Sequence, residues 1–150
     1  QILDGGPSLV GVESTIIDCT KENPSILRPG AITAEMVEQS TGIIVVEPDD
    51  KKVRVSGSHK QHYSPQAKVV IDGVAKPSEA LIAMSEIETP VDVVRLAAPK
   101  NLEEYARVLY AALREADKHG IATINIAMPE GGGLAVAIRD RITRAAAAKE

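Results

Sequence analysis

The residues best suited to bind an anion lie near the start of the chain, in GVESTIID and SILRPG, residues 11–18 and 25–30. Ser14 and Thr15 place two hydroxyl groups in a strand-like run, and Arg28 stands directly before a Pro-Gly turn. Because proline fixes its φ angle and glycine accepts a positive one, this turn restricts the backbone that carries the guanidinium. A guanidinium held in this way suits bidentate binding of a carboxylate or phosphate. Hydroxyl residues are also ordinary in strands, so the pattern leaves both interpretations open.

Two further groups of residues could also contact a ligand. His62 and Tyr63 each carry a polar tip on an aromatic ring within a long polar stretch, so they are either ligand contacts or exposed loop residues. Together with His59 and His119 they show no metal-binding spacing, which argues against a dedicated metal site. The triple glycine at 131–133 precedes a predicted helix, and helix N-termini attract anions. It lacks the spacing and the Lys-Ser/Thr of a P-loop, which favours a flexible connection.

Length and composition define the class of protein that must position these residues. The chain has 150 residues, 44% of them hydrophobic and 25% charged, which is typical of one globular domain or two small ones. The net charge of −4 argues against broad binding to nucleic acid, although a local cluster can still bind ATP. Cys19 is the single cysteine, so no internal disulfide forms, and we expect a reducing, cytoplasmic location. No apolar run reaches the roughly 18 residues of a membrane span, so we expect no membrane association.

The chain divides into three zones. Residues 1–48 hold three strand-like runs (VESTIID, SILRP and GIIVVE) and one predicted helix over 32–42, with Thr33 as its N-cap and Gly42 beyond its end. Residues 49–66 are polar and lack periodicity, which is typical of a linker or lid. The third zone is residues 67–150.

The third zone alternates between strand-like and helical patterns. The predicted order is strand, helix, strand, helix, strand, helix, at residues 68–72, 77–87, 91–97, 101–120, 121–127 and 134–148. Asn101 and Gly120 are suitable residues to begin and end the longest helix. This order predicts a small α/β domain with a three-stranded parallel sheet and covering helices.

The motifs DGGPSLVGVESTIID, SILRPGAIT and SGSHKQHYSP, followed by this α/β tail, resemble the C-terminal half of an L-threonylcarbamoyladenylate synthase of the two-domain, YrdC-like family. The resemblance spans essentially the whole chain. It implies an α/β fold in which residues 1–48 are the C-terminal part of a twisted YrdC-like catalytic domain. Residues 49–66 would be a linker that closes over the catalytic cavity, and residues 67–150 a small Rossmann-like parallel βαβαβα domain.

The same resemblance implies a reaction. The family combines L-threonine, bicarbonate and ATP into threonylcarbamoyl-AMP and pyrophosphate, with Mg²⁺, for threonylcarbamoyladenosine modification of tRNA by a downstream complex. By resemblance, Ser14, Thr15 and Arg28 would contact ATP or threonine, and His62 and Tyr63 would belong to the lid. No residue is assigned as the catalytic base, and the acidic net charge argues against direct tRNA binding by this chain.

This sequence departs from the family pattern at its start. The family's Lys-x-Arg and Ser-x-Asn elements precede the DGGP segment, whereas only Gln1, Ile2 and Leu3 precede Asp4 here. We therefore expect the chain to be a portion of a longer enzyme and to be inactive by itself. The alternative is a non-catalytic module in which the Rossmann-like domain binds a nucleotide or a protein.

Overall fold

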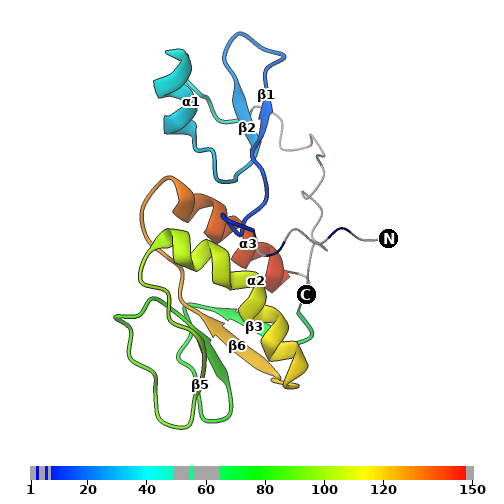
Figure 1. The fold of residues 1–150 in the computed structure, drawn as a ribbon, viewed down its shortest axis with the longest axis vertical. Coiled ribbons are helices and arrows are strands. Elements are labelled where there is room, and N and C mark those ends of the chain that lie inside the picture. Colours follow the sequence, from blue (N-terminus) through cyan, green and yellow to red (C-terminus); the bar gives the residue numbers. More distant parts are fainter. Residues whose placement is uncertain (1–2, 4–5, 7, 49–54, 56–64, 148–150) are drawn as a thin grey trace.

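The computed structural model describes residues 3, 6, 8–48, 55 and 65–147. We call residues 8–48 the N-terminal unit and residues 65–147 the α/β unit; the former lies beside the helices of the latter (Figure 1). The N-terminal unit contains β1 (Ile16–Asp18), β2 (Ser25–Arg28) and α1 (Ala34–Thr41). The α/β unit contains β3 (Lys68–Ile71), β4 (Ala80–Ile82), β5 (Val94–Ala97), α2 (Leu102–Lys118), β6 (Thr123–Ile126) and α3 (Leu134–Ala147).

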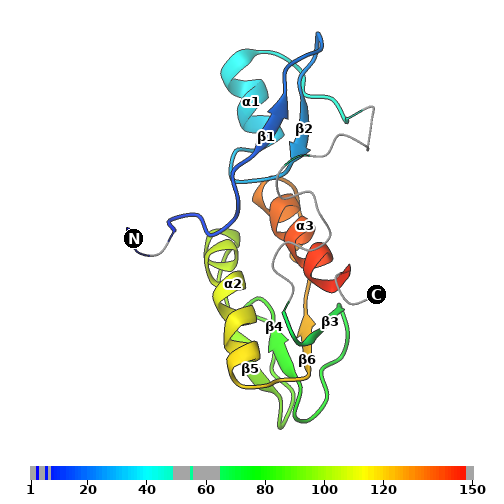
Figure 2. The same ribbon diagram turned by 90° about the vertical axis from the view of Figure 1, so that its right-hand side faces the viewer.

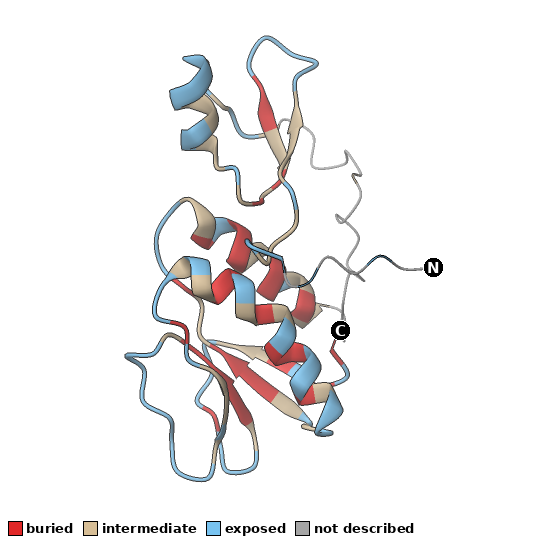
Figure 3. Ribbon diagram, viewed as in Figure 1, coloured by how far each residue is buried: buried red, intermediate tan, exposed pale blue. Residues whose placement is uncertain are grey.

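The α/β unit is built on a four-stranded parallel sheet in the order β3-β6-β4-β5. Helices α2 and α3 pack side by side against one face (Figure 2). The main core lies between these two layers, where Tyr105 and Leu109 of α2 meet Ile138 of α3 and the sheet. The buried residues accordingly lie on the sheet-facing sides of both helices (Figure 3). The prediction of an α/β fold with a parallel sheet is confirmed.

The predicted helix at residues 77–87 is wrong, because this segment contains β4. Its residues are buried on both faces of the sheet: Ala80 and Ile82 join the main core, whereas Leu81 and Ala83 form a second small cluster with Ala75. A central strand covered on both sides is apolar throughout, and a short apolar run cannot be distinguished from a helix by periodicity. The sheet therefore has four strands instead of three, and the order of elements is βββαβα.

The connection between β4 and β5 contains no helix and is ordered by one arginine. The Arg95 guanidinium donates to the carbonyl oxygens of Ala83, Met84, Ile87 and Ala97 at 2.7–2.8 Å. Burial of the guanidinium lowers the pKa of Arg95. Since buried carbonyl groups must be paired, the hydrogen bonds from Arg95 fix the backbone of this loop, which forms no helix of its own.

Helices α1 and α2 begin and end at the capping residues that were predicted for them. Thr33 caps α1 and Gly42 follows it with φ 70°, the left-handed conformation that glycine adopts without strain. In α2 the Asn101 side chain accepts from the amide of Glu104, and Gly120 with φ 65° follows its end. No helix in the described residues is long and apolar enough to cross a bilayer.

The N-terminal unit is small and weakly covered. Strands β1 and β2 are antiparallel, whereas the third strand-like run, GIIVVE, makes a single parallel bridge from Val46 to Ser25, so the third predicted strand is wrong. Helix α1 has no buried residue. The segment before β1 crosses α2 so closely that a Cβ at Gly11 would lie 2.3 Å from the Cα of Arg107. The next residue, Val12, packs against the main core, so this segment attaches the N-terminal unit to the α/β unit.

Candidate functional site

Arg28 ends β2, and its side chain folds back onto the segment before β1. Its Nε donates to the Ser14 carbonyl oxygen at 2.9 Å, and its Nη2 donates to the Ser14 hydroxyl at 3.0 Å. Its Nη1 lies 3.3 Å from Oε2 of Glu13. The Ser14 hydroxyl accepts from Arg28, so its own hydrogen can still be donated to a ligand. The structure thus places Ser14 and Arg28 in direct contact, with Ser14 exposed and Arg28 buried.

Thr15 directs its hydroxyl away from this contact. Its Oγ1 donates to the Ile32 carbonyl oxygen at 2.6 Å and accepts from the Ile32 amide at 3.1 Å. A hydroxyl has one hydrogen to donate, so in this arrangement Thr15 has no donor left for an anion. A Cβ added to Gly30 would lie 2.4 Å from the Glu13 carbonyl oxygen and the Thr15 amide nitrogen. The absence of a side chain at Gly30 therefore allows the turn after β2 to lie against the segment that carries the hydroxyls.

An arginine from the α/β unit completes this cluster. Arg141 of α3, only 4% exposed, places Nη1 2.5 Å from the same Glu13 Oε2 that Arg28 approaches. Its Nε and Nη2 donate to Asp140, whose carboxylate also accepts from Arg144 at 3.0 Å. Burial acts to lower the pKa of Arg141, but the Asp140 and Glu13 carboxylates outweigh it, so the pKa is raised. The Glu13–Arg141 ion pair thus joins the two units, and Arg28 extends it in the N-terminal unit as Asp140 and Arg144 do within α3.

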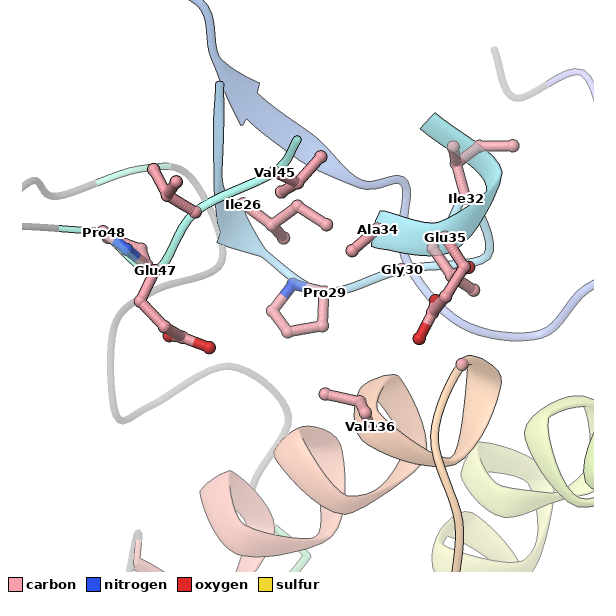
Figure 4. A pocket seen from close by; sticks show the side chains of 13 residues that line it. Ile26, Pro29, Gly30, Ile32, Ala34, Glu35, Val45, Glu47, Pro48 and Val136 are labelled. Carbon is pink, nitrogen blue, oxygen red and sulfur yellow. The ribbon is translucent and has the colours of Figure 1, made fainter. Parts of the chain in front are cut away.

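A cavity of about 310 Å³ lies between the N-terminal unit and α3 (Figure 4). Pro29 and Gly30 line one side of it, and Val136 of α3 lines another. Glu35 and Glu47 are its charged residues, and the lining that the structure describes includes no cationic side chain. Carboxylates repel a phosphate, so this lining suits apolar or positively charged groups. The three predicted anion contacts are not among the described residues around it.

The remaining candidates have ordinary explanations or lie outside the described residues. His62 and Tyr63 belong to the latter group, as does most of the predicted linker at 49–66, namely residues 49–54 and 56–64. The His119 ring, at the end of α2, lies 2.7 Å from the Glu115 carboxylate. The triple glycine before α3 faces an acid, because a Cβ at Gly132 would lie 3.6 Å from the Glu35 carboxylate. The described residues contain no group of three or more histidine, cysteine or acidic residues that could hold a metal.

Arg141 and its partner Glu13 are separated by 128 positions, and their pairing was not predicted from the sequence. A signal was present in α3. Its apolar stripe runs through Leu134, Ile138 and Ala145, and Arg141 occupies the position of the same stripe that an apolar residue would normally take. A buried arginine needs an acidic partner, and such a position indicates one.

The family model described as "Threonylcarbamoyl-AMP synthase, C-terminal domain" matches residues 32–147. The chain therefore belongs to this family of α/β domains. The protein named threonylcarbamoyl-AMP synthase in Pyrococcus abyssi is 34% identical over 96% of this chain and 48% of its own length. The protein of the same name in Bacillus subtilis is 32% identical over 97% of this chain and 48% of its own length. The chain thus spans about half the length of these relatives.

Solved structures of P. abyssi Sua5 have a similar fold. The structure described as complexed with L-threonine matches with a TM-score of 0.77 at 29% identity, over 97% of this chain and 49% of that one. A variant in which a histidine and the tyrosine after it are both replaced by alanine matches with a TM-score of 0.71 at 27% identity, over 97% and 48%. The similarity covers both the N-terminal and the α/β units.

Proposed function

We propose that the protein carrying these residues forms threonylcarbamoyl-AMP and pyrophosphate from L-threonine, bicarbonate and ATP, supplying tRNA modification to threonylcarbamoyladenosine. The observation that supports this most is the similarity along 96% of the chain to a threonylcarbamoyl-AMP synthase. A second support is the fold shared with a Sua5 structure that holds L-threonine. Membership of the family alone would be consistent with a binding module, whereas similarity that includes the Ser14–Arg28 segment favours the enzyme.

The chemistry assigns roles to the predicted residues. The carbamate of threonine attacks the α-phosphorus of ATP, and charge develops on the leaving pyrophosphate. A fixed guanidinium such as Arg28 stabilises this charge, and the Ser14 hydroxyl can donate to a phosphate or carboxylate oxygen. In contrast to the sequence-based prediction of a direct contact, we assign Thr15 to hold the backbone beside Ser14, because its hydroxyl is bonded to Ile32.

The proposed reaction also involves Mg²⁺ and the lid, neither of which the described residues include. The described residues offer no acidic cluster for a metal, so we assign Mg²⁺ to the ATP phosphates, which are its usual ligands in such reactions. His62 and Tyr63 form an adjacent His-Tyr pair in the predicted lid, and we assign them to closing the site against water. A labile carbamate requires such exclusion.

The decisive assay measures pyrophosphate release by the full-length protein and by the 150-residue chain. We expect release from the full-length protein only when ATP, L-threonine and bicarbonate are all present, and none from the chain alone, which would carry one wall of the site. Release independent of threonine, or no release by the full-length protein, would overturn the proposed reaction. Release by the chain alone would overturn the expectation of inactivity.

A pair of serine variants tests the site itself. Ser14→Ala removes the hydroxyl that contacts Arg28. Ser40→Ala is the matched control, since among the described residues its hydroxyl bonds within α1, to the Met36 carbonyl. We expect Ser14→Ala to raise the KM for ATP or threonine and Ser40→Ala to leave both unchanged. Equal kinetics for the two variants would remove Ser14 from the site.

A further inference from the structure

Gly11 brings the backbone of the N-terminal unit into direct contact with helix α2, over which the segment before β1 runs (Figure 2). A Cβ at Gly11 would lie 2.3 Å from the Cα of Arg107 and 2.4 Å from the carbonyl oxygen of Ala106. Both are backbone atoms, which cannot turn aside as the end of a side chain can. With φ 78°, Gly11 also has the left-handed conformation that glycine adopts without strain. The chain can therefore cross α2 this closely because residue 11 has no side chain.

The two residues after Gly11 also contact the α/β unit. Val12 packs against the main core, and Oε2 of Glu13 lies 2.5 Å from Nη1 of Arg141 on α3. Ser14, whose hydroxyl belongs to the proposed anion site, is the next residue. The chain thus reaches Ser14 through three consecutive residues that are in contact with the α/β unit.

Further along, the same segment lies against the turn after β2. A Cβ at Gly30 would lie 2.4 Å from the Glu13 carbonyl oxygen, so this contact is also between backbones. Arg28, two residues before Gly30, donates to the carbonyl and hydroxyl oxygens of Ser14. Residues 11–15 thus contact α2 at one end and this turn at the other, with a glycine at each contact. Close-packed backbone has no room to absorb a displacement, so a shift at one contact is passed along the segment.

We propose that Gly11 is a positioning residue for the anion site: its close contact with α2 fixes the segment that carries Ser14, and so sets where the Ser14 hydroxyl lies relative to Arg28. The proposal rests on the proposed function and deepens it, since it gives the α/β unit a part in binding the substrate. A hydrogen bond tolerates little displacement, so a shift of about 1 Å at Ser14 is enough to weaken the binding of a phosphate or carboxylate.

The alternative is that the contact at Gly11 only joins the two units. A side chain at position 11 would then tilt the N-terminal unit as one body, and Ser14 would keep its place beside Arg28. Both roles predict a less stable protein when Gly11 is replaced, so the melting temperature does not separate them. The KM does, because a loss of folded protein lowers the maximal rate without changing the KM of the molecules that remain folded.

The test compares Gly11→Ala with Gly120→Ala in the full-length protein. Gly120 also has a positive φ, 65°, but a Cβ there would have no atom within 4 Å, so this control introduces the backbone strain without the collision. We expect Gly11→Ala to raise the KM for ATP or L-threonine in pyrophosphate release by about three- to tenfold, the equivalent of one hydrogen bond. Gly120→Ala should leave both KM values unchanged.

The position of Ser14 is measured in the 150-residue chain, from the NMR signal of the Arg28 Nε–H that donates to the Ser14 carbonyl oxygen at 2.9 Å. Gly11→Ala should shift this signal, and Gly120→Ala should not. If Gly11→Ala fails to fold, Val12→Ala takes its place, because it loosens the same segment without a collision, and we expect the same direction of change in both measurements. An unshifted signal would refute the positioning role.

The two proposals fail separately. If the full-length wild type releases no pyrophosphate, the reaction is refuted, and the NMR comparison still decides whether α2 positions Ser14. If it releases pyrophosphate but Gly11→Ala keeps the wild-type KM for both substrates, the positioning role is refuted while the reaction stands.

Discussion

Replacing Thr15 by valine would decide whether its hydroxyl supports the backbone or contacts a substrate. Valine has nearly the same shape but cannot form the bonds at 2.6 and 3.1 Å that join Thr15 to the carbonyl and amide of Ile32. Each such bond contributes a net 0.5–1.5 kcal/mol, and the site is partly open to water, so we expect the local opening free energy to fall by about 1–2 kcal/mol. This corresponds to an equilibrium constant for local opening that is roughly 5- to 30-fold larger.

Hydrogen exchange at the Ile32 amide measures this directly, because that amide is the donor to Thr15. We expect faster exchange in Thr15→Val and near wild-type exchange in Thr15→Ser, which keeps the hydroxyl. Ser14→Ala is the neighbouring control and should leave Ile32 unaffected. Unchanged Ile32 exchange in Thr15→Val, accompanied by a higher KM for a substrate, would refute the supporting role and restore Thr15 as a ligand contact.

Three further predictions concern stability. Gly30→Ala should lower the melting temperature and displace the turn after β2, because its Cβ would lie 2.4 Å from two backbone atoms; unchanged β1–β2 chemical shifts would contradict this. Tyr105→Phe should cost about 1–2 kcal/mol in urea unfolding, since its buried hydroxyl donates at 2.7 Å to the carbonyl that follows β6; an unchanged free energy of unfolding would contradict this. The Lys76 amide and then the Asn125 side chain lower the pKa of Glu79, so its contribution to stability is present above the ordinary value of 4.5 and lost as the pH falls below it. Asn125→Ala should therefore weaken the acid-side loss of stability seen in pH-dependent urea unfolding, and an identical pH profile would contradict it.

The sequence predicted those parts of the fold that depend on neighbouring residues. The bounds of α1 and α2 followed from Thr33 and Asn101 as N-caps and from glycines beyond their ends, which are local signals. Strand β4 was missed because its run Ala-Leu-Ile-Ala is apolar on both faces, a property that only the finished sheet explains.

The candidate site was predictable in its residue types and not in its contacts. Ser14 and Arg28 could be selected because their chemistry suits anions, and they do touch. The bonds of Thr15 to a residue 17 positions away depend on how two segments pack, which no local pattern shows. The pairing of Glu13 with Arg141 spans almost the whole chain. The sequence feature that indicated an acidic partner was the position of Arg141 in the apolar stripe of α3.

The position of β6 in the sheet has a consequence for how the chain folds. Although β3 precedes β4 in sequence, the two do not pair; β6, the last strand, lies between them and pairs with both. Until residues 123–126 are in place, β3 has no neighbour in this sheet. Pairings between such distant segments form slowly, since a long loop must close first. Folding of the α/β unit must therefore wait for the final third of the sequence, and a chain cut between α2 and β6 would retain β4 and β5 as a pair but leave β3 detached.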